Sequence, residues 1–336
     1  MTPLPSIKEI RSLFPITSFH ERSLASSRLQ AKAILSGTDQ RKVVIVGPCS
    51  VHDKRSTLEY ARRLKDLAQE VSESLLLIMR VYVEKPRTAL GWKGLLYDPH
   101  LDGSGDVQTG LIWTRELFTQ LVELEVPIAT EFVDPITAFY FQDLVTWGFI
   151  GARTSASQPH RQLASMLRFP IGFKNDVQGA LQGALNGALL ARHSHHLIGL
   201  SDEGHLCAMQ SSGNPWSHIV LRGADTHSNY EEHFVRDAIE MLQQMRLPPR
   251  LMIDCAHGNS NKDPRLQPIT YHAVLEQMAE GREEIFGVML ESHLEGGSQT
   301  LSEDPSQLKY ATSITDPCMS WATTEELIRC ASVYCV

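Results

Sequence analysis

The chain has 336 residues, of which 42% are hydrophobic, and its formal net charge is −8 at pH 7. The acidic balance argues against sequence-independent binding of nucleic acid, which needs a basic face, and no apolar run approaches the roughly 18 residues that cross a bilayer. The apolar content is sufficient for one large core, and α/β barrels of more than about 250 residues commonly form a single domain.

The N-terminal sequence predicts a helical arm rather than a targeting signal. It has no basic segment followed by an apolar stretch, so a secretory signal is not expected. Helices are predicted at Ile7–Leu13 and Leu24–Leu35, within an arm over residues 1–38, and residues 39–336 are assigned to the barrel domain. The six cysteines are Cys49, Cys207, Cys255, Cys318, Cys330 and Cys335. Their scattered positions do not form a disulfide framework, which favours a reduced, cytoplasmic protein.

Short apolar runs alternate with helical patterns along the rest of the chain. The candidate strands are Val43–Val46, Leu75–Val83, Ile128–Phe132, Phe149–Arg153, Ile171–Lys174, Leu197–Leu200, Ile219–Arg222, Leu251–Cys255 and Ile285–Glu291. The candidate helices are Thr57–Glu73, Thr114–Leu124, Asp176–Arg192, Tyr230–Met245 and Thr270–Gly281. Continuous apolar runs are typical of parallel strands buried on both faces, so the alternation predicts a parallel sheet, open or closed.

Two details of this pattern give sharper predictions. Nine runs are one more than an eight-stranded barrel holds, and no helix fits between Leu200 and His218. One of the flanking runs is therefore expected to leave the barrel wall in a β-hairpin. In the helix predicted at Asp176–Arg192, three glycines recur every fourth residue, which places them on one face and predicts close packing against a neighbouring element.

Charged and metal-binding side chains stand at or just beyond the ends of the apolar runs. The cationic set is Arg80, Lys85, Arg87, Arg153, Lys174 and Arg222. The second set is Cys49, His257, Glu291 and Asp316, residue types that can hold a first-row divalent metal. In a parallel barrel the carboxyl ends of the strands meet at one mouth, where active sites lie. Six cations at one mouth would repel each other unless anions bind, and phosphates and carboxylates are the obvious candidates.

Each of these residues has an ordinary structural interpretation when it is taken alone. A lone cysteine at a strand end is usually a small packed residue, and a lone arginine or lysine there is usually solvated. A structural barrel with charges around its mouth would explain each residue but not the repulsion among all of them. Their joint occurrence at successive strand ends favours a site. By contrast, His193, His195 and His196 follow a helix in a predicted turn and are expected to be surface residues.

Several motifs together resemble one enzyme family. They are Gly47-Pro48-Cys49-Ser50, Glu84-Lys85-Pro86-Arg87-Thr88, Gly91-Trp92-Lys93-Gly94, Asp98-Pro99-His100, Gly151-Ala152-Arg153-Thr154, Gly172-Phe173-Lys174-Asn175, Leu221-Arg222-Gly223, His257-Gly258-Asn259-Ser260, Glu291-Ser292-His293-Leu294 and Ser313-Ile314-Thr315-Asp316. In this order the chain resembles, from about Ile7 to Leu327, the microbial type I 3-deoxy-arabino-heptulosonate 7-phosphate (DAHP) synthases of the subgroup regulated by aromatic amino acids.

The resemblance implies a (β/α)8 barrel that joins phosphoenolpyruvate to erythrose 4-phosphate, the first step of aromatic amino acid biosynthesis. It implies one divalent metal ion (manganese, iron, cobalt or zinc), held by Cys49, His257, Glu291 and Asp316. The substrate-binding positions that it implies are Arg80, Lys85, Arg87, Thr88, Glu131, Arg153, Lys174 and Arg222. Among all these residues, Lys85, His257 and Cys49 are the predicted catalytic residues. The family also implies a homo-oligomer, dimeric or tetrameric.

Two alternatives remain open at the level of the sequence. The related 3-deoxy-manno-octulosonate 8-phosphate synthases use arabinose 5-phosphate on a similar barrel, and the form of the Lys85-Pro86-Arg87-Thr88 loop argues against them. A non-catalytic, effector-binding barrel would be marked by the loss of a metal ligand or a substrate-binding arginine. The sequence retains all of these residues.

Overall fold

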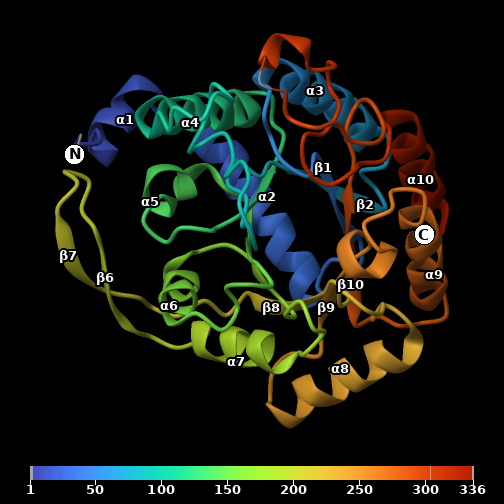
Figure 1. Cartoon of the computed structure of the whole chain (residues 1–336). Coiled ribbons are helices and arrows are strands. Elements are labelled where there is room, and N and C mark those ends of the chain that lie inside the picture. Colours follow the sequence, from blue (N-terminus) through green and yellow to red (C-terminus); the bar gives the residue numbers. More distant parts are fainter. Residues whose placement is uncertain (1–2, 303, 335–336) are drawn as a thin grey trace.

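The computed structural model describes residues 3–302 and 304–334. At its centre is a closed barrel of parallel strands in the order β1-β10-β9-β8-β5-β4-β3-β2 (Figure 1). The barrel strands are β1 (Lys42–Gly47), β2 (Leu75–Arg80), β3 (Ile128–Glu131), β4 (Trp147–Ile150), β5 (Ile171–Lys174), β8 (Ser217–Leu221), β9 (Leu251–Asp254) and β10 (Ile285–Glu291). The predicted (β/α)8 barrel is confirmed.

Helices surround this barrel and follow its strands along the chain (Figure 1). They are α1 (Ile7–Leu13), α2 (Ser18–Ser36), α3 (Lys54–Glu70), α4 (Val107–Glu123), α5 (Ala138–Phe141), α6 (Gln158–Met166), α7 (Gln182–Ala191), α8 (Glu232–Gln244), α9 (Gln267–Ala279) and α10 (Trp321–Tyr334). Polar caps set several boundaries. At the start of α3, for example, the Asp53 carboxylate accepts hydrogen bonds from the backbone N–H groups of Arg55 and Ser56.

The strands are buried on both faces because two apolar clusters sandwich them. One cluster lies between the strands and the surrounding helices and includes Val44, Val46 and Leu77. The other fills the barrel and includes Val43, Ile45 and Trp147. Successive residues of a strand point to opposite faces, so alternate residues of each run enter alternate clusters. This double burial explains why the strands read as continuous apolar runs.

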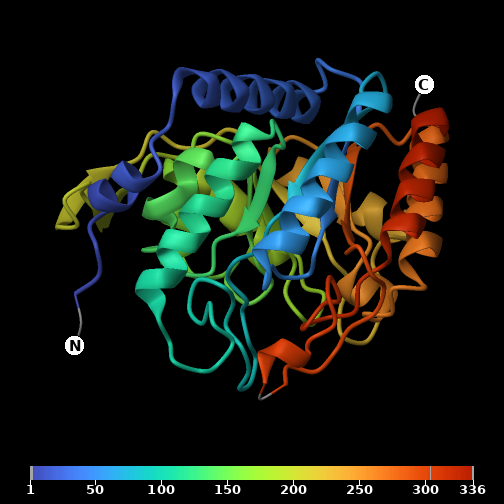
Figure 2. The same ribbon diagram turned by 90° about the horizontal axis from the view of Figure 1, so that it is seen from above.

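Helix α2 lies across one end of the barrel, and long loops gather at the opposite end (Figure 2). The side chains of Ala31, Ile34 and Leu35 pack into the cluster that fills the barrel. The guanidinium of Arg250, just before β9, donates to the Ile34 carbonyl oxygen at 2.7 Å and ties the helix to the barrel. The end closed by α2 holds the amino ends of the strands, so the carboxyl ends open toward the loops.

A two-stranded antiparallel hairpin stands outside the barrel wall. It comprises β6 (His196–Leu200) and β7 (Leu206–Gln210), and it lies beside α1 at the edge of the molecule (Figure 1). The backbone N–H of Lys8 donates to the Asp202 carbonyl oxygen at 2.8 Å and joins the arm to the turn of the hairpin. The prediction that one run leaves the barrel in a hairpin is confirmed.

The prediction for the glycine-rich helix is partly wrong. Helix α7 begins at Gln182 rather than Asp176 because the preceding residues form a turn, in which Gly179 has a φ of +96°. Gly187 packs as expected, since a Cβ atom there would lie 2.6 Å from the ring of Phe173, and Gly179, although outside the helix, also packs closely, with a Cβ atom 3.1 Å from Ala224. A Cβ atom on Gly183 would meet nothing within 4 Å, so this glycine faces open space.

Neither a disulfide nor a candidate membrane span is found in the part of the chain that the structure describes. Cys49, Cys207, Cys255, Cys318 and Cys330 are free thiols, and Cys335 lies outside the described residues. Within residues 3–302 and 304–334, no helix combines the length and the apolar character needed to cross a membrane.

Candidate active site

The strands change from apolar to polar at their carboxyl ends, on the inward face. Because successive residues of a strand point to opposite faces, residues two positions apart point to the same face. Arg80 therefore points inward like Ile78, and Asp254 points inward like Met252. The polar residues that close the inner layer in this way are Arg80, Glu131, Lys174, Arg222, Asp254 and Glu291. All six are buried, with at most 6% of each residue exposed. Charged rather than apolar side chains therefore form the bottom of the barrel mouth.

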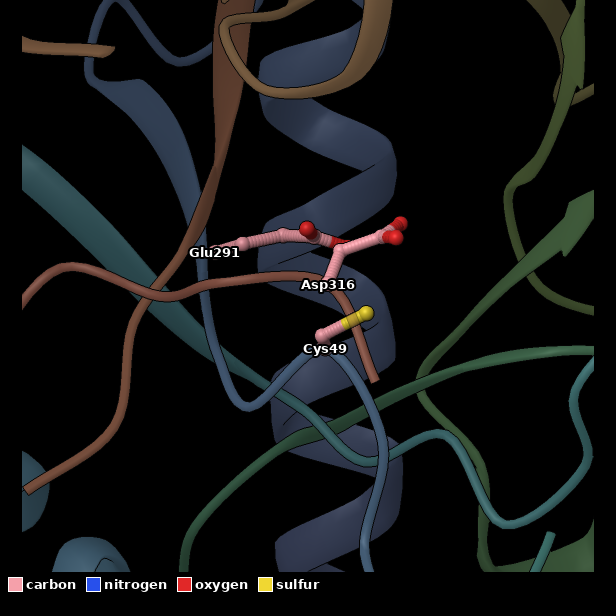
Figure 3. A group of neighbouring side chains, drawn as sticks. All are labelled: Cys49, Glu291 and Asp316. Atoms are coloured by element: carbon pink, nitrogen blue, oxygen red, sulfur yellow. The ribbon is translucent and has the colours of Figure 1, made fainter. Parts of the chain in front are cut away.

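Three predicted metal ligands come together at this mouth. Cys49 follows β1, Glu291 ends β10 and Asp316 lies in the loop before α10, and their side chains extend toward the same region (Figure 3). Their ligand atoms all lie within 4.8 Å of one another. The fourth predicted ligand, His257, lies beside this group, with its Nε2 atom 3.6 Å from Oε1 of Glu291.

The chemistry of these four side chains fits a divalent metal ion. Burial, reinforced by the charge of Glu291, raises the pKa of the Cys49 thiol to about 11. A cation at this place would favour the thiolate, as a metal-coordinated thiol is deprotonated. Burial also acts to raise the pKa of Asp316, but Lys85 and His257 lower it below its usual value. Two carboxylates, one thiolate and one imidazole form a mixed donor set that suits first-row metals.

Arg80 lies beneath this group and is fully buried. Its Nη2 atom is 2.8 Å from Glu291 Oε1, and its guanidinium also donates to the carbonyl oxygens of Pro48 and Cys49. The guanidinium lies over the ring of Tyr82, 3.5 Å from the ring centroid. Arg80 therefore fixes the loop that carries Cys49 and orients the Glu291 carboxylate.

A cavity of about 280 Å³ opens above the metal-ligand group. The cations that line it are Lys85, Arg87, Arg153, Lys174, Arg222 and Lys262. Glu131, His257 and Asp316 line it as well. Of the six cations predicted to share the mouth, five face this cavity and Arg80 lies below it. Lys262 was missed because it follows a 3-10 turn rather than a strand end.

Lys85 connects the cationic wall to the metal-ligand group. Its Nζ atom lies 3.1 Å from Cys49 Sγ and 3.3 Å from the Cys49 carbonyl oxygen. Burial acts to lower the pKa of Lys85, but the neighbouring Cys49 and Glu291 raise it above its usual value. The side chain is therefore an ammonium ion, placed to donate a proton or a hydrogen bond into the cavity.

The remaining predicted substrate-binding residues lie along the rim and one wall. Arg87 and Thr88 belong to the exposed loop after β2, and Arg153 Nε donates to Thr88 Oγ1 at 2.7 Å. On the wall, Gly151 gives the Glu131 carboxylate its room, because a Cβ atom at this glycine would lie 2.1 Å from Oε1 of Glu131. All eight predicted substrate-binding residues thus lie at the same end of the barrel.

Asp254 is the main residue of the site that the sequence did not single out. It ends β9, is fully buried, and its Oδ2 atom lies 2.7 Å from Lys174 Nζ and 2.9 Å from His257 Nδ1. Burial acts to raise the pKa of Asp254, but His257 and Lys174 lower it well below its ordinary value. The available signal was its strand position, two residues after the inward Met252.

Comparison with known proteins shows the family of this chain. The sequence profile described as the DAHP synthetase I family matches residues 20–329. The chain belongs to the DAHP synthetase I family. This membership identifies it as an enzyme of the transferase class and fits neither the octulosonate synthase nor the non-catalytic alternative.

Individual proteins of this family are similar to the chain over nearly its whole length. It is 45% identical to the Tyr-sensitive phospho-2-dehydro-3-deoxyheptonate aldolase of Escherichia coli (strain K12), over 98% of this chain and 91% of the relative. It is 39% identical to the tyrosine-inhibited enzyme of Schizosaccharomyces pombe, over 97% of this chain and 88% of the relative. The solved phospho-2-dehydro-3-deoxyheptonate aldolase of Francisella tularensis matches with a TM-score of 0.97 and 38% identity, over 100% of this chain and 97% of that chain.

The histidine-rich segment at residues 193–196 lies outside the site. Cys49, Glu291 and Asp316 form the one group of three or more potential metal ligands found among the described residues. His193, His195 and His196 form no such group there, and His195 Nε2 instead lies 2.8 Å from the Leu190 carbonyl oxygen.

Proposed function

We propose that this site condenses phosphoenolpyruvate with erythrose 4-phosphate and water, giving 3-deoxy-arabino-heptulosonate 7-phosphate and inorganic phosphate. One observation carries the proposal: a single cavity presents six cationic side chains beside a cysteine–carboxylate group. Two phosphorylated substrates, one of which also has a carboxylate, would neutralise these cations. Family membership supports the same reaction.

We assign phosphoenolpyruvate to the inner part of the cavity. Lys174 and Arg222 are buried there with 3% and 4% exposure, so their charges are weakly screened and hold an anion strongly. Together with Lys85 and Arg153, they would fix the phosphate and carboxylate of phosphoenolpyruvate. Arg80 would support this site from below through Glu291 and the Cys49 loop.

Erythrose 4-phosphate would enter from the rim. Arg87 and Thr88 would bind its phosphate there, and the hydrogen bond from Arg153 to Thr88 links this loop to the inner site. Glu131 lines the wall between the two regions and would face the hydroxyl groups of the sugar. This arrangement would place the aldehyde end toward the metal-ligand group.

We assign one divalent metal ion to Cys49, His257, Glu291 and Asp316, with manganese, iron, cobalt and zinc as candidates. When bound, such an ion supplies Lewis acidity that polarises the aldehyde oxygen of the sugar. Lys85 is close enough to act on the same oxygen, because its ammonium lies 3.1 Å from Cys49 Sγ. Its pKa, held above the usual value, keeps the side chain protonated, so its N–H groups can donate to that oxygen.

The proposed condensation forms one carbon–carbon bond and breaks one carbon–oxygen bond. The C3 carbon of phosphoenolpyruvate forms a bond with the aldehyde carbon, whose oxygen takes a proton from Lys85. Water adds to the C2 carbon and gives up a proton, which restores the ammonium of Lys85. The bond between C2 and the bridging oxygen then breaks, phosphate leaves with that oxygen, and the second proton of the former water goes to the departing phosphate as C2 becomes a ketone. The protein's part is orientation and preorganised charge.

A substrate and metal titration tests the proposed function. Metal-free protein is expected to show no turnover with phosphoenolpyruvate and erythrose 4-phosphate, and added divalent metal should restore it. Arabinose 5-phosphate should react on the order of 100-fold more slowly, because the cavity and its loop must exclude one extra carbon. Phosphate release, measured with each sugar and metal, checks both points. Full activity without metal, or equal rates with the two sugars, would contradict the proposal.

We also propose that the chain forms a homo-oligomer, a dimer or a tetramer, through the arm and the hairpin. Ile198 and Leu206 on the hairpin are 78% and 73% exposed, and Leu13 at the end of α1 is 57% exposed. Large exposed apolar side chains on adjacent segments favour a contact in which they are buried against another protein surface. Light scattering should give a mass of two or four chains of 37.6 kDa. Replacing Ile198 and Leu206 by aspartate should lower it, and a monomeric parent protein would refute the proposal.

A further inference from the structure

Asp254 is a fully buried carboxylate shared by a proposed substrate-binding lysine and a proposed metal-binding histidine. Its Oδ2 atom lies 2.7 Å from Lys174 Nζ and 2.9 Å from His257 Nδ1. Its other oxygen, Oδ1, accepts a hydrogen bond from the backbone N–H of Ala256 at 3.0 Å. One carboxylate thus accepts hydrogen bonds from Lys174 and Ala256 and also lies within ion-pair distance of His257, so it contacts two different parts of the site.

The contact with His257 determines which ring nitrogen can bind a metal. A carboxylate next to Nδ1 favours the tautomer that carries its proton there, which leaves the lone pair on Nε2. Nε2 is the atom that faces the metal-ligand group, 3.6 Å from Glu291 Oε1. The backbone of His257 has a φ of +52°, in the left-handed region that residues other than glycine rarely adopt.

The contact with Lys174 is equally specific. Lys174 is 3% exposed, and Asp254 is its one ion-pair partner among the residues that the structure describes. The other polar contact of its Nζ atom is a weak one, with Met289 Sδ at 3.5 Å. Without Asp254 the buried side chain would lose the group that directs it toward the cavity.

We infer that Asp254 is a positioning residue that holds both Lys174 and His257, so that binding of phosphoenolpyruvate and binding of the metal ion depend on the same carboxylate. This inference rests on the proposed function, because it takes Lys174 as a phosphoenolpyruvate ligand and His257 as a metal ligand. It goes further, because it joins two binding events through a residue that touches neither ligand.

Asparagine at this position gives a sharp test. It has nearly the same size as aspartate, but one of its two polar atoms is an NH2 donor. If the NH2 group takes the place of Oδ2, it meets the ammonium of Lys174 and the N–H of His257. If it takes the place of Oδ1, it meets the N–H of Ala256 instead. No orientation satisfies all three donors, and a donor next to Nδ1 would favour the tautomer with the proton on Nε2.

The experiment compares wild type, D254N and D254E by calorimetric titration of metal-free protein with Mn²⁺ and, separately, with phosphoenolpyruvate. D254N is expected to bind Mn²⁺ about 10- to 100-fold more weakly. Its affinity for phosphoenolpyruvate should fall about tenfold, as for loss of one charge-assisted contact. The KM for erythrose 4-phosphate should stay within a factor of two, since Arg87 and Thr88 do not touch Asp254. D254E keeps a carboxylate and should lie between wild type and D254N in both affinities.

The matched control is D143N. Asp143 also pairs with two cations, since it accepts a hydrogen bond from Arg115 Nη1 at 2.5 Å and lies 3.7 Å from Arg11 Nε, but it lies away from the cavity. D143N should lower thermal stability and leave both binding constants unchanged. If D254N behaves in the same way, the inference is overturned; if D254N does not fold, a parallel loss of both affinities in D254E supports it and unchanged affinities refute it. Absence of turnover in wild type that still binds both ligands would count against the proposed reaction alone.

Discussion

Replacement of Cys49 by alanine is expected to remove metal-dependent turnover while the barrel remains folded. Cys49 is fully buried, and its thiol is one of the three ligand atoms that lie within 4.8 Å of one another. Alanine removes the sulfur donor and leaves Lys85 Nζ without its partner at 3.1 Å. Because a Lewis acid contributes several kcal/mol to such a step, turnover should fall on the order of 1,000-fold. Metal content and phosphate release, measured on the same sample, check this expectation.

The control for this variant is Cys255→Ala. Cys255 is also fully buried, but its side chain packs in the apolar cluster outside the barrel wall. Both substitutions should cost on the order of 1 kcal/mol in the free energy of unfolding, as for loss of a methyl-sized group from a core. Only Cys49→Ala should lose metal. If it retains wild-type turnover and metal content, the assignment of Cys49 as a ligand is wrong.

Replacement of Lys174 by alanine is expected to impair the use of phosphoenolpyruvate and to destabilise the fold. The ammonium faces the cavity and pairs with Asp254 at 2.7 Å. Its removal takes one buried cation from the substrate site, and kcat/KM for phosphoenolpyruvate should fall about 100-fold or more. It also leaves Asp254 with one positively charged neighbour fewer, and breaking a buried pair costs about 3–5 kcal/mol. Steady-state kinetics and chemical denaturation measure the two effects separately.

The variant Lys174→Arg separates the loss of fold stability from the loss of substrate binding. Arginine keeps the cation, so the fold should lose less stability than with alanine, while the changed shape still disturbs the substrate contact. A variant with methionine keeps most of the volume and removes the charge. Normal KM values for phosphoenolpyruvate in both the alanine and the methionine variants would show that Lys174 does not bind this substrate.

Local sequence patterns were sufficient for most of the fold. The apolar runs of β1 and β10 read as strands because each is buried by helices on one side and by the barrel interior on the other. The missing helix between Leu200 and His218 identified the hairpin without tertiary information. The pattern failed at the start of α7, where Asp176 caps a turn by accepting from the N–H groups of Gln178 and Ala180. A short polar side chain there competes with the helix, and apolar periodicity does not register this.

Part of the candidate site could be predicted from the sequence in the same way. Residues at strand ends, such as Lys174 and Glu291, were found because charge after an apolar run is unusual. Asp254 has the same character, yet the pattern does not mark it, because it lies inside the run Leu251–Cys255, which leads to the more conspicuous His257. Lys262 could not be found by this rule, since a 3-10 turn rather than a strand brings it to the cavity.

By itself, the sequence determined the alternation of strands and helices, the hairpin and the chemical types of side chain available at the strand ends, because these follow from local periodicity, whereas the closed barrel was implied by the resemblance of its ordered motifs to a family. Tertiary structure alone decided which of these charges meet: Arg80 pairs with Glu291 below the cavity, whereas Lys174 reaches Asp254. Such pairing depends on strand order and register around the closed barrel, where residues more than 200 positions apart become neighbours. A buried charge takes the partner that the fold brings within a few ångströms, and no local pattern encodes that distance.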